Sequence, residues 1–270
     1  MKCPICDNTV FEKIFTFSAP PIIETRYESL ANTQYHRETW QCRNCGHFVD
    51  RNKMDLSAIY SGEYVNATYK DLIGVINTFI RIISLPPNKS DNTGRVNRLN
   101  EFCKKYWGDN HHHTVLDVGS GLGVFPYLMK KNGWKVTALD PDARAIEHIE
   151  NNVGVDCICG DFFDVTSDQK FDLITFNKVL EHVNDPVAML KKSKDNLANG
   201  GLLYVEVPDG DIASLDGSER EEFTIDHLHI FSFISLAITA DKAGFYPLTI
   251  ERLQEPSTKY TLRAFLKQKD

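Results

Sequence analysis

The sequence predicts an α/β protein built on a largely parallel sheet. From Thr114 onward, short apolar runs alternate with helical runs, which is the pattern of strands joined by crossover helices. The first apolar run leads into a glycine-rich turn, and the second ends in an acidic residue, Asp140. A turn of that kind and an acid at the next strand's tip are typical of nucleotide sites in open α/β sheets. We therefore expect helices on both faces of the sheet and a ligand at its carboxyl edge.

Seven strands and four helices are expected in this region. The last two strands are separated only by the short polar stretch 254–257, so they should form an antiparallel hairpin at the sheet edge. The expected strands are 114–118, 135–139, 155–159, 171–176, 202–207, 247–253 and 259–267, and the expected helices are 124–132, 142–151, 185–197 and 232–243. Before this region, residues 95–107 have helical spacing, whereas 86–94 has the composition of a linker.

Composition excludes several classes of protein. The chain of 270 residues has a net charge of −7, which argues against a broad surface for nucleic acid. Its longest apolar stretch, 72–85, is too short to span a bilayer. The N-terminus lacks the apolar core of a signal peptide, and paired cysteines favour a reducing compartment, so we expect a cytoplasmic protein.

Four cysteines stand in two C-x-x-C pairs, Cys3 with Cys6 and Cys42 with Cys45. Two such pairs can supply four thiolates to one tetrahedral Zn²⁺. A site closed by four thiolates has no open position, so the zinc is expected to be structural, with a redox pair or chance as the alternatives. The three other cysteines are expected to lie in the core.

The glycine-rich turn distinguishes two ligand classes. It contains Gly119, Gly121 and Gly123, with Asp117 two residues before the first glycine. The dinucleotide pattern G-x-G-x-x-G requires a glycine at position 124, which is a valine here. The pattern D-x-G-x-G-x-G resembles the first motif of class I S-adenosylmethionine (SAM) methyltransferases. That resemblance implies a Rossmann-like fold, whose seven strands end in an antiparallel hairpin, and SAM as the cofactor.

The same resemblance implies roles for residues at the strand ends. The glycines would line the methionine end of SAM, and Asp140 would hold the ribose hydroxyls. Asp161 would meet the adenine amino group while Phe162 packs on the ring, and Asn177 could face the methionine ammonium. The cofactor-binding residues implied are Asp117, Gly119, Gly121, Gly123, Asp140, Asp161, Phe162 and Asn177.

The stretch 178–186 also looks like the V-L-E-H-V-x-D-P region of many small-molecule methyltransferases. His182 in this stretch could face the substrate or bond to nearby backbone, and the sequence leaves both open.

The acceptor side is indicated by the polar, histidine-rich stretch 222–232. It resembles a segment of zinc-ribbon sugar C-methyltransferases and of methyltransferases in polysaccharide gene sets. The resemblance implies that Asp226 orients His227 and that His227 is the catalytic base, the alternative being a histidine that holds the backbone. His229 is a less favoured candidate for a part in the chemistry. Tyr60 or Tyr64, in a tyrosine-rich stretch, could touch the cofactor or acceptor, or pack in the core.

These observations predict three domains and a methyltransferase. A zinc ribbon is expected at 1–55, a helical cap and linker at 56–94, and the SAM-dependent domain at 95–270. The expected acceptor is small and polar, such as a sugar, nucleotide-sugar or polysaccharide precursor, methylated on oxygen or carbon. The alternatives are a protein- or RNA-directed enzyme that uses the ribbon, or an enzyme of aromatic or quinone-like metabolites. The acceptor atom and the oligomeric state are left open.

Overall fold

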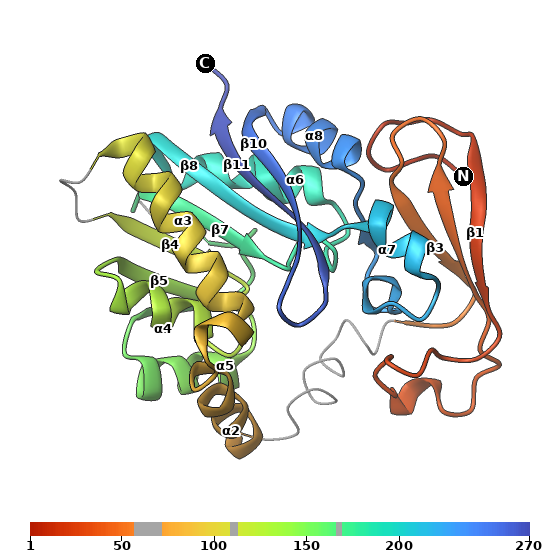
Figure 1. Ribbon diagram of the computed structural model, residues 1–270, viewed down its shortest axis with the longest axis horizontal. Helices are drawn as coiled ribbons and strands as arrows, with labels where there is room; N and C mark the ends of the chain where they lie inside the picture. The colour runs from red at the N-terminus through yellow and green to blue at the C-terminus, as the bar shows by residue number, and fades with distance from the viewer. Residues whose placement is uncertain (57–71, 109–112, 166–168) are drawn as a thin grey trace.

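The computed structural model describes residues 1–56, 72–108, 113–165 and 169–270. Within these ranges the chain forms two sheets, one of seven strands and one of four. The four-stranded sheet lies beside the carboxyl edge of the seven-stranded one, where β8 (Leu197–Pro208) runs into α7 (Gly210–Asp216) (Figure 1). No helix among the described residues has the length and apolar character needed to cross a membrane.

The seven-stranded sheet confirms the predicted α/β fold. Its order is β10-β11-β8-β7-β4-β5-β6, and the five strands from β8 to β6 are parallel. β11 runs antiparallel to both β8 and β10, so the expected terminal hairpin is present. The strands are β4 (Thr114–Val118), β5 (Lys135–Asp140), β6 (Asp156–Cys159), β7 (Phe171–Asn177), β8 (Leu197–Pro208), β10 (Phe245–Gln254) and β11 (Tyr260–Gln268).

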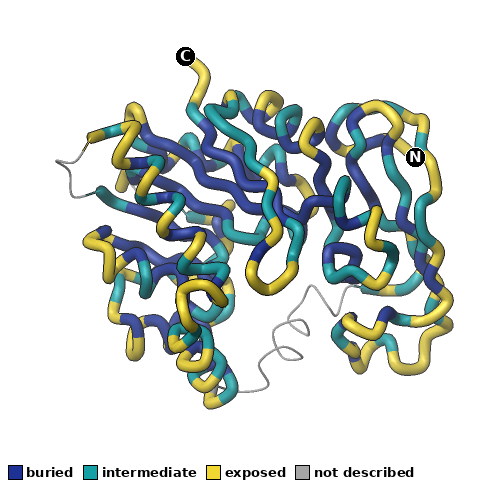
Figure 2. The backbone as a smooth tube through the Cα atoms, in the orientation of Figure 1, coloured by how far each residue is buried: buried dark blue, intermediate teal, exposed yellow. Residues whose placement is uncertain are grey.

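Helices bury both faces of this sheet, as its parallel strands require. Leu99 of α3 and Met129 of α4 pack on one face, whereas Leu190 of α6 and Leu236 of α8 pack on the other. The central strands are buried along most of their length (Figure 2). The helices are α2 (Leu72–Ile83), α3 (Asp91–Trp107), α4 (Val124–Lys131), α5 (Ala143–His148), α6 (Pro186–Lys192) and α8 (Phe233–Lys242), with a π-helical turn at Ile149–Val153 and 3₁₀ turns at Glu28–Leu30, Pro87–Lys89, Ser193–Asp195 and Glu221–Phe223.

Three local expectations were wrong. The stretch 86–94 is not only a linker: Ser90 caps α3 by accepting the Thr93 N–H (3.2 Å), so the helix begins at Asp91. The helix expected at 185–197 ends at Lys192, because Leu197 pairs with the neighbouring strand and starts β8. Cys159 is exposed rather than buried in the core.

The four-stranded sheet contains a strand that comes from far along the chain. Its order is β1-β2-β3-β9, and β9 lies in the segment between β8 and α8. β9 pairs antiparallel with β3, Phe48 opposite Ile230 and Val49 opposite His229. The strands are β1 (Phe11–Phe17), β2 (Arg37–Cys42), β3 (Phe48–Asn52) and β9 (His229–Ile230). The cysteine-bearing region therefore shares a sheet with the predicted catalytic segment.

A buried ion cluster reinforces this junction. The Arg37 side chain is 0% exposed and contacts the carboxylates of Asp50 and Glu24. Its guanidinium also donates to the Phe223 carbonyl (2.7 Å), and Glu24 accepts the Ile225 N–H (2.9 Å). Arg37 thus neutralises two buried acids and holds the segment that leads to β9.

We expect Arg37→Met to lower the free energy of unfolding by about 3–5 kcal/mol, since it leaves two buried carboxylates without their cation. Lys53→Met, at an exposed position, is the matched control and should change stability by less than about 0.5 kcal/mol. Urea unfolding of the parent and the two variants measures both changes in the free energy of unfolding. Equal stability of the Arg37 variant and the parent would contradict the role given to this cluster.

Candidate functional site

The glycine-rich turn between β4 and α4 adopts a conformation that favours glycine. Gly119, Gly121 and Gly123 have φ angles of 71°, 49° and 69°, in the left-handed region. The N–H groups of Gly119 and Ser120 donate to the Leu139 carbonyl (2.8 and 3.1 Å), which ties the turn to β5.

The three glycines serve different purposes. A Cβ on Gly119 would meet Val179 Cγ2 at 2.7 Å, and one on Gly123 would meet Ile149 Cγ1 at 2.7 Å. These two positions have glycine because neighbouring side chains pack closely on the turn. A Cβ on Gly121 would meet no described atom within 4 Å. Gly121 therefore leaves main chain accessible where a ligand can approach it.

Asp140 connects the turn to the end of β5. Its Oδ2 accepts the Gly121 N–H (2.8 Å), and its Oδ1 accepts the Asp142 N–H (2.9 Å). Burial raises the pKa of this carboxyl, although both N–H groups oppose that effect. Each oxygen retains a second lone pair, so the predicted ribose contact is chemically possible and stays a prediction.

A polar cluster stands at the carboxyl ends of β4 and β7. Asp117 Oδ1 accepts from Thr175 Oγ1 (2.6 Å) and from Asn177 Nδ2 (2.8 Å). The other end of the same amide, Asn177 Oδ1, is buried and has no hydrogen-bond partner among the described residues. Burial raises the pKa of Asp117 to about 6 against these bonds. A buried acceptor without a donor, beside an acid, fits a ligand that brings a positively charged donor.

The predicted adenine residues lie after β6. Asp161 Oδ1 accepts the Phe163 N–H (2.8 Å), which forms a local turn. The Phe162 ring is only 2% exposed and meets Phe176 edge-on, with centroids 5.7 Å apart, whereas Phe163 is exposed. Adenine contacts by these residues stay predictions. Tyr60 and Tyr64 lie outside the described residues.

The loop after β7 and the segment before β9 are joined by main-chain hydrogen bonds. The Glu181 carbonyl accepts the N–H groups of Leu228 (2.7 Å) and His229 (3.2 Å). This pairing brings His182 to His227, with ring centroids 5.0 Å apart. Val179 of the same loop would meet a Cβ on Gly119 at 2.7 Å, so this loop packs against the glycine turn at the carboxyl ends of β4 and β7.

The histidines are oriented by main-chain carbonyls. His227 Nδ1 donates to the Glu222 carbonyl (2.9 Å), and His182 Nδ1 donates to the Asp226 carbonyl (3.0 Å). The predicted acid lies on the other side of the His227 ring, since Asp226 Oδ2 is 3.9 Å from Nε2. A carbonyl can only accept, so each neutral ring carries its lone pair on Nε2. His227 Nε2 is therefore able to accept a proton.

The second C-x-x-C pair is linked to this segment through His47, which is not among the predicted site residues. His47 Nε2 lies 3.0 Å from His229 Nδ1, and His47 Nδ1 lies 3.3 Å from Ser235 Oγ. Both rings are buried, and burial lowers the pKa of His47 and of His229. Only the position of His47, directly after Cys45-Gly46, hinted at a contact, because its partners are distant in the chain.

The four cysteine sulfurs converge. Cys3 Sγ is 3.6 Å from Cys45 Sγ, and Cys6 Sγ is 3.5 Å from Cys42 Sγ, with no disulfide. All four sulfurs lie within 4.8 Å of one another. A tetrahedral zinc with Zn–S bonds of about 2.3 Å places neighbouring sulfurs about 3.8 Å apart. The donor set and its spacing therefore fit one zinc ion.

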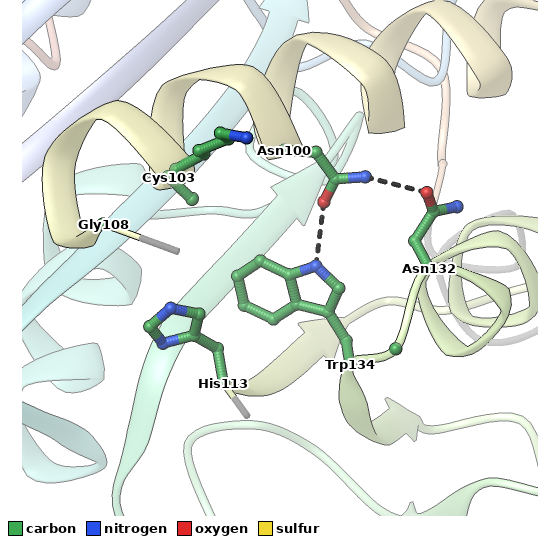
Figure 3. A pocket seen from close by; sticks show the side chains of 8 residues that line it. Asn100, Cys103, Gly108, His113, Asn132 and Trp134 are labelled. Carbon is green, nitrogen blue, oxygen red and sulfur yellow. Dashed lines mark hydrogen bonds between the residues drawn. The ribbon is translucent and has the colours of Figure 1, made fainter. Parts of the chain in front are cut away.

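A shallow pocket lies at the opposite end of the sheet. It is lined mainly by α3 and the loops before β4 and β5, and there Trp134 Nε1 donates to Asn100 Oδ1 (2.8 Å) (Figure 3). The pocket faces the amino ends of the strands, away from the glycine turn. Ligands of open α/β sheets bind at the carboxyl ends, so we assign it no part in the reaction.

Comparison with known proteins places this site in a family. The family model described as "Methyltransferase domain" matches residues 90–250. The chain belongs to this methyltransferase family. The matched range contains the glycine turn, the Asp117–Asn177 cluster and both histidines, so the enzyme is a SAM-dependent methyltransferase.

Curated relatives differ in their acceptors. The chain is 27% identical to the cypemycin N-terminal methyltransferase of a Streptomyces species, over 60% of this chain and 69% of that protein. It is 35% identical to the ubiquinone biosynthesis O-methyltransferase of Coxiella burnetii, over 33% of this chain and 41% of that protein. The match thus spans less than half of the ubiquinone enzyme.

Solved structures share the fold. A Burkholderia thailandensis 1,6-didemethyltoxoflavin-N1-methyltransferase, solved with that compound and S-adenosylhomocysteine (SAH), aligns with a TM-score of 0.60 at 16% identity. The alignment covers 85% of this chain and 99% of that chain. The glycopeptide N-methyltransferase MtfA aligns over 64% of this chain and 89% of its own, with a TM-score of 0.51 at 13% identity.

The buried acid predicts how cofactor binding depends on pH. The methionine ammonium is attracted by the ionised form of Asp117, so binding of SAH should strengthen as pH rises through about 6. Calorimetry between pH 5 and 8 measures this. Asp117→Asn keeps an oxygen that can accept from Thr175 and Asn177, and it should remove most of the pH dependence of SAH binding. The remaining pH dependence is expected from Asp140, because burial also raises the pKa of that carboxyl. An equal slope in both proteins would contradict the assignment.

Proposed function

We propose that this methyltransferase transfers the SAM methyl group to a hydroxyl oxygen, or an acidic carbon, of a small carbohydrate-like acceptor. The observation that carries the proposal is His227, whose Nε2 holds a lone pair in a partly exposed polar cluster with Asp226 and His182. A hydroxyl acceptor must lose its proton as the methyl group is transferred, and a positioned imidazole is suited to that task.

Charge around His227 supports its role as the base. Asp226 Oδ2 lies 3.9 Å from His227 Nε2 and 3.7 Å from His182 Nδ1, with its side chain 11% exposed. Burial raises the pKa of this carboxyl, but the two neighbouring histidines, together with hydrogen bonds from the main chain and Thr224, bring the pKa below its ordinary value. An ionised Asp226 stabilises the imidazolium that forms when His227 takes a proton. In this proposal Asp226 acts through charge, and the Glu222 carbonyl orients the ring.

The polarity of the surrounding side chains favours a hydrogen-bonding acceptor over an aromatic one. Glu181, His182, Asp226 and His227 all bring polar atoms to the junction of the two loops. Bound SAM supplies an activated methyl group, and the chain must align the acceptor with it and exclude water. An acceptor with several hydroxyls can satisfy such a cluster, whereas a flat apolar ring would leave its groups without partners.

We also propose that the four cysteines bind a structural zinc ion. The support is the spacing of the sulfurs and the packing of the second pair against α8, where Ser232 Oγ donates to the Cys45 carbonyl. The zinc would fix the turn that bears His47, and through it the segment that contains His227.

The base proposal is tested with isotopically labelled SAM and a panel of acceptors. We expect methyl transfer to a nucleotide-sugar or free sugar, and a loss of about 10²–10⁴-fold in kcat for His227→Ala with SAH binding retained. His36→Ala, at an exposed histidine, should keep full activity. Transfer only to a catechol-type ring or to a peptide amine would overturn the acceptor class. Near-normal turnover of the His227 variant would overturn the base.

Native mass spectrometry tests the zinc proposal. The purified chain should retain one zinc, and Cys45→Ser should lose it, while Cys159→Ser, at an exposed cysteine, keeps it. Loss of zinc should also speed hydrogen exchange at the amides of Leu228 and His229, because the turn that holds β9 is released. A metal-free parent that shows unchanged exchange at these amides would contradict the structural role.

A further inference from the structure

A second group of metal-ligating side chains lies at the junction of the two loops. Glu181, His182 and His227 each offer one ligand atom, and these atoms lie within 4.8 Å of one another. None of them belongs to the cysteine cluster. Two come from the loop after β7 and the third from the segment before β9. The hydrogen bonds from Leu228 and His229 to the Glu181 carbonyl keep these two segments together.

The histidines are in the tautomer that binds metal through Nε2. Each donates its Nδ1–H to a main-chain carbonyl, His182 to Asp226 (3.0 Å) and His227 to Glu222 (2.9 Å). Histidines that bind metal in proteins almost always donate the other ring N–H in this way, which fixes the ring and raises its basicity. Two histidines with the same kind of bond, and with rings 5.0 Å apart, satisfy this requirement together.

Glu181 supplies the independent observation that a cation belongs here. The residue is only 1% exposed, and its Oε2 is buried without a hydrogen-bond partner among the described residues. A buried carboxylate oxygen without a partner is destabilising, because burial removes it from water and no donor replaces the water. The nearby ammonium of Lys178 is bound to Thr261 Oγ1 (2.7 Å). The Asp226 carboxylate beside both rings adds further negative charge.

We propose that Glu181, His182 and His227 form a binding site for a divalent transition metal ion of the zinc class. Two imidazoles and one carboxylate suit Zn²⁺ or Co²⁺, whereas Mg²⁺ prefers a shell of oxygen ligands. Bonds of about 2.1 Å to a tetrahedral ion need ligand atoms about 3.4 Å apart, and these three ligand atoms lie within 4.8 Å of one another without an ion. Three protein ligands leave a fourth position for water or an acceptor oxygen.

One consequence of this site rests on the proposed function. The lone pair on His227 Nε2 cannot bind an ion and take a proton at the same time. If His227 is the base, an ion at this site therefore inhibits methyl transfer. Free zinc would then regulate the enzyme through the residues that perform its chemistry.

The binding test uses the full chain with its cysteine cluster already loaded with zinc. Titration with Co²⁺ should give the visible absorption of a four-coordinate site, and calorimetry with Zn²⁺ should show one further equivalent. Glu181→Gln and His227→Gln, which conserve size, should each weaken this equivalent at least about tenfold. Mg²⁺ should not compete. Thermal unfolding of each variant confirms that it is folded.

Two controls separate this site from other ligands. His36→Ala removes an exposed histidine, and the double variant His111→Ala, His112→Ala shortens the H-H-H run. Both should keep the second equivalent. The proposal is overturned if no second equivalent binds, or if it persists unchanged in the Glu181 and His227 variants.

Activity then distinguishes this proposal from the function on which it draws. Zinc binding with inhibition of the parent supports both. Zinc binding that leaves turnover unchanged or higher keeps the metal site and overturns His227 as the base. If no second zinc ion binds and methyl transfer by His227→Ala is slow, the metal site is overturned and His227 stands as the base.

Discussion

The pairing of β3 with β9 is the contact on which the arrangement of the site depends. It is short, Phe48 with Ile230 and Val49 with His229, but it joins the cysteine-bearing sheet to the segment that follows Asp226 and His227. On its own, a stretch between β8 and α8 would be a surface loop. Pairing with β3 on one side, and bonding to the Glu181 carbonyl on the other, holds His227 in a defined position.

Buried polar contacts surround this pairing and add to its specificity. Arg37 and Glu24 hold the main chain at Phe223 and Ile225 before β9, and His47 meets His229 within it. Isolated groups of this kind would be costly to bury, so each requires its partner from the other part of the chain. The N-terminal region therefore supports the segment that is predicted to bind the acceptor.

The seven-stranded sheet could be predicted from sequence because its signals are local. Each strand is a short apolar run, and each crossover helix has apolar residues at helical spacing. The turn after β4 has left-handed backbone at three glycines, which the glycine pattern indicates. Helix ends were less predictable, since the start of α3 depends on a single cap at Ser90 and the end of α6 on the pairing of Leu197. The distinct purposes of Gly119 and Gly121 depend on Val179, which the spacing of the glycines does not reveal.

The contacts that complete the candidate site are not local, and the sequence alone could not supply them. β9 has only two residues and no periodicity, and the partners of His182 and His47 lie far along the chain. The resemblance of the segment 222–232 to sugar enzymes led to His227, but it assigned the orientation of the ring to Asp226. The Glu222 carbonyl supplies that hydrogen bond. Every residue has a main-chain carbonyl, so the residue types in the sequence do not show which carbonyl is the partner.

The shared sheet also constrains how the protein is made. β1, β2 and β3 leave the ribosome early, yet the strand that covers the free edge of β3 is encoded at 229–230. Until then the nascent chain exposes an unpaired strand edge, the feature that most readily recruits other polypeptides. Translation must therefore proceed from residue 52 to residue 230 before this edge is protected, and chaperones that bind extended segments can act on β3 throughout that interval.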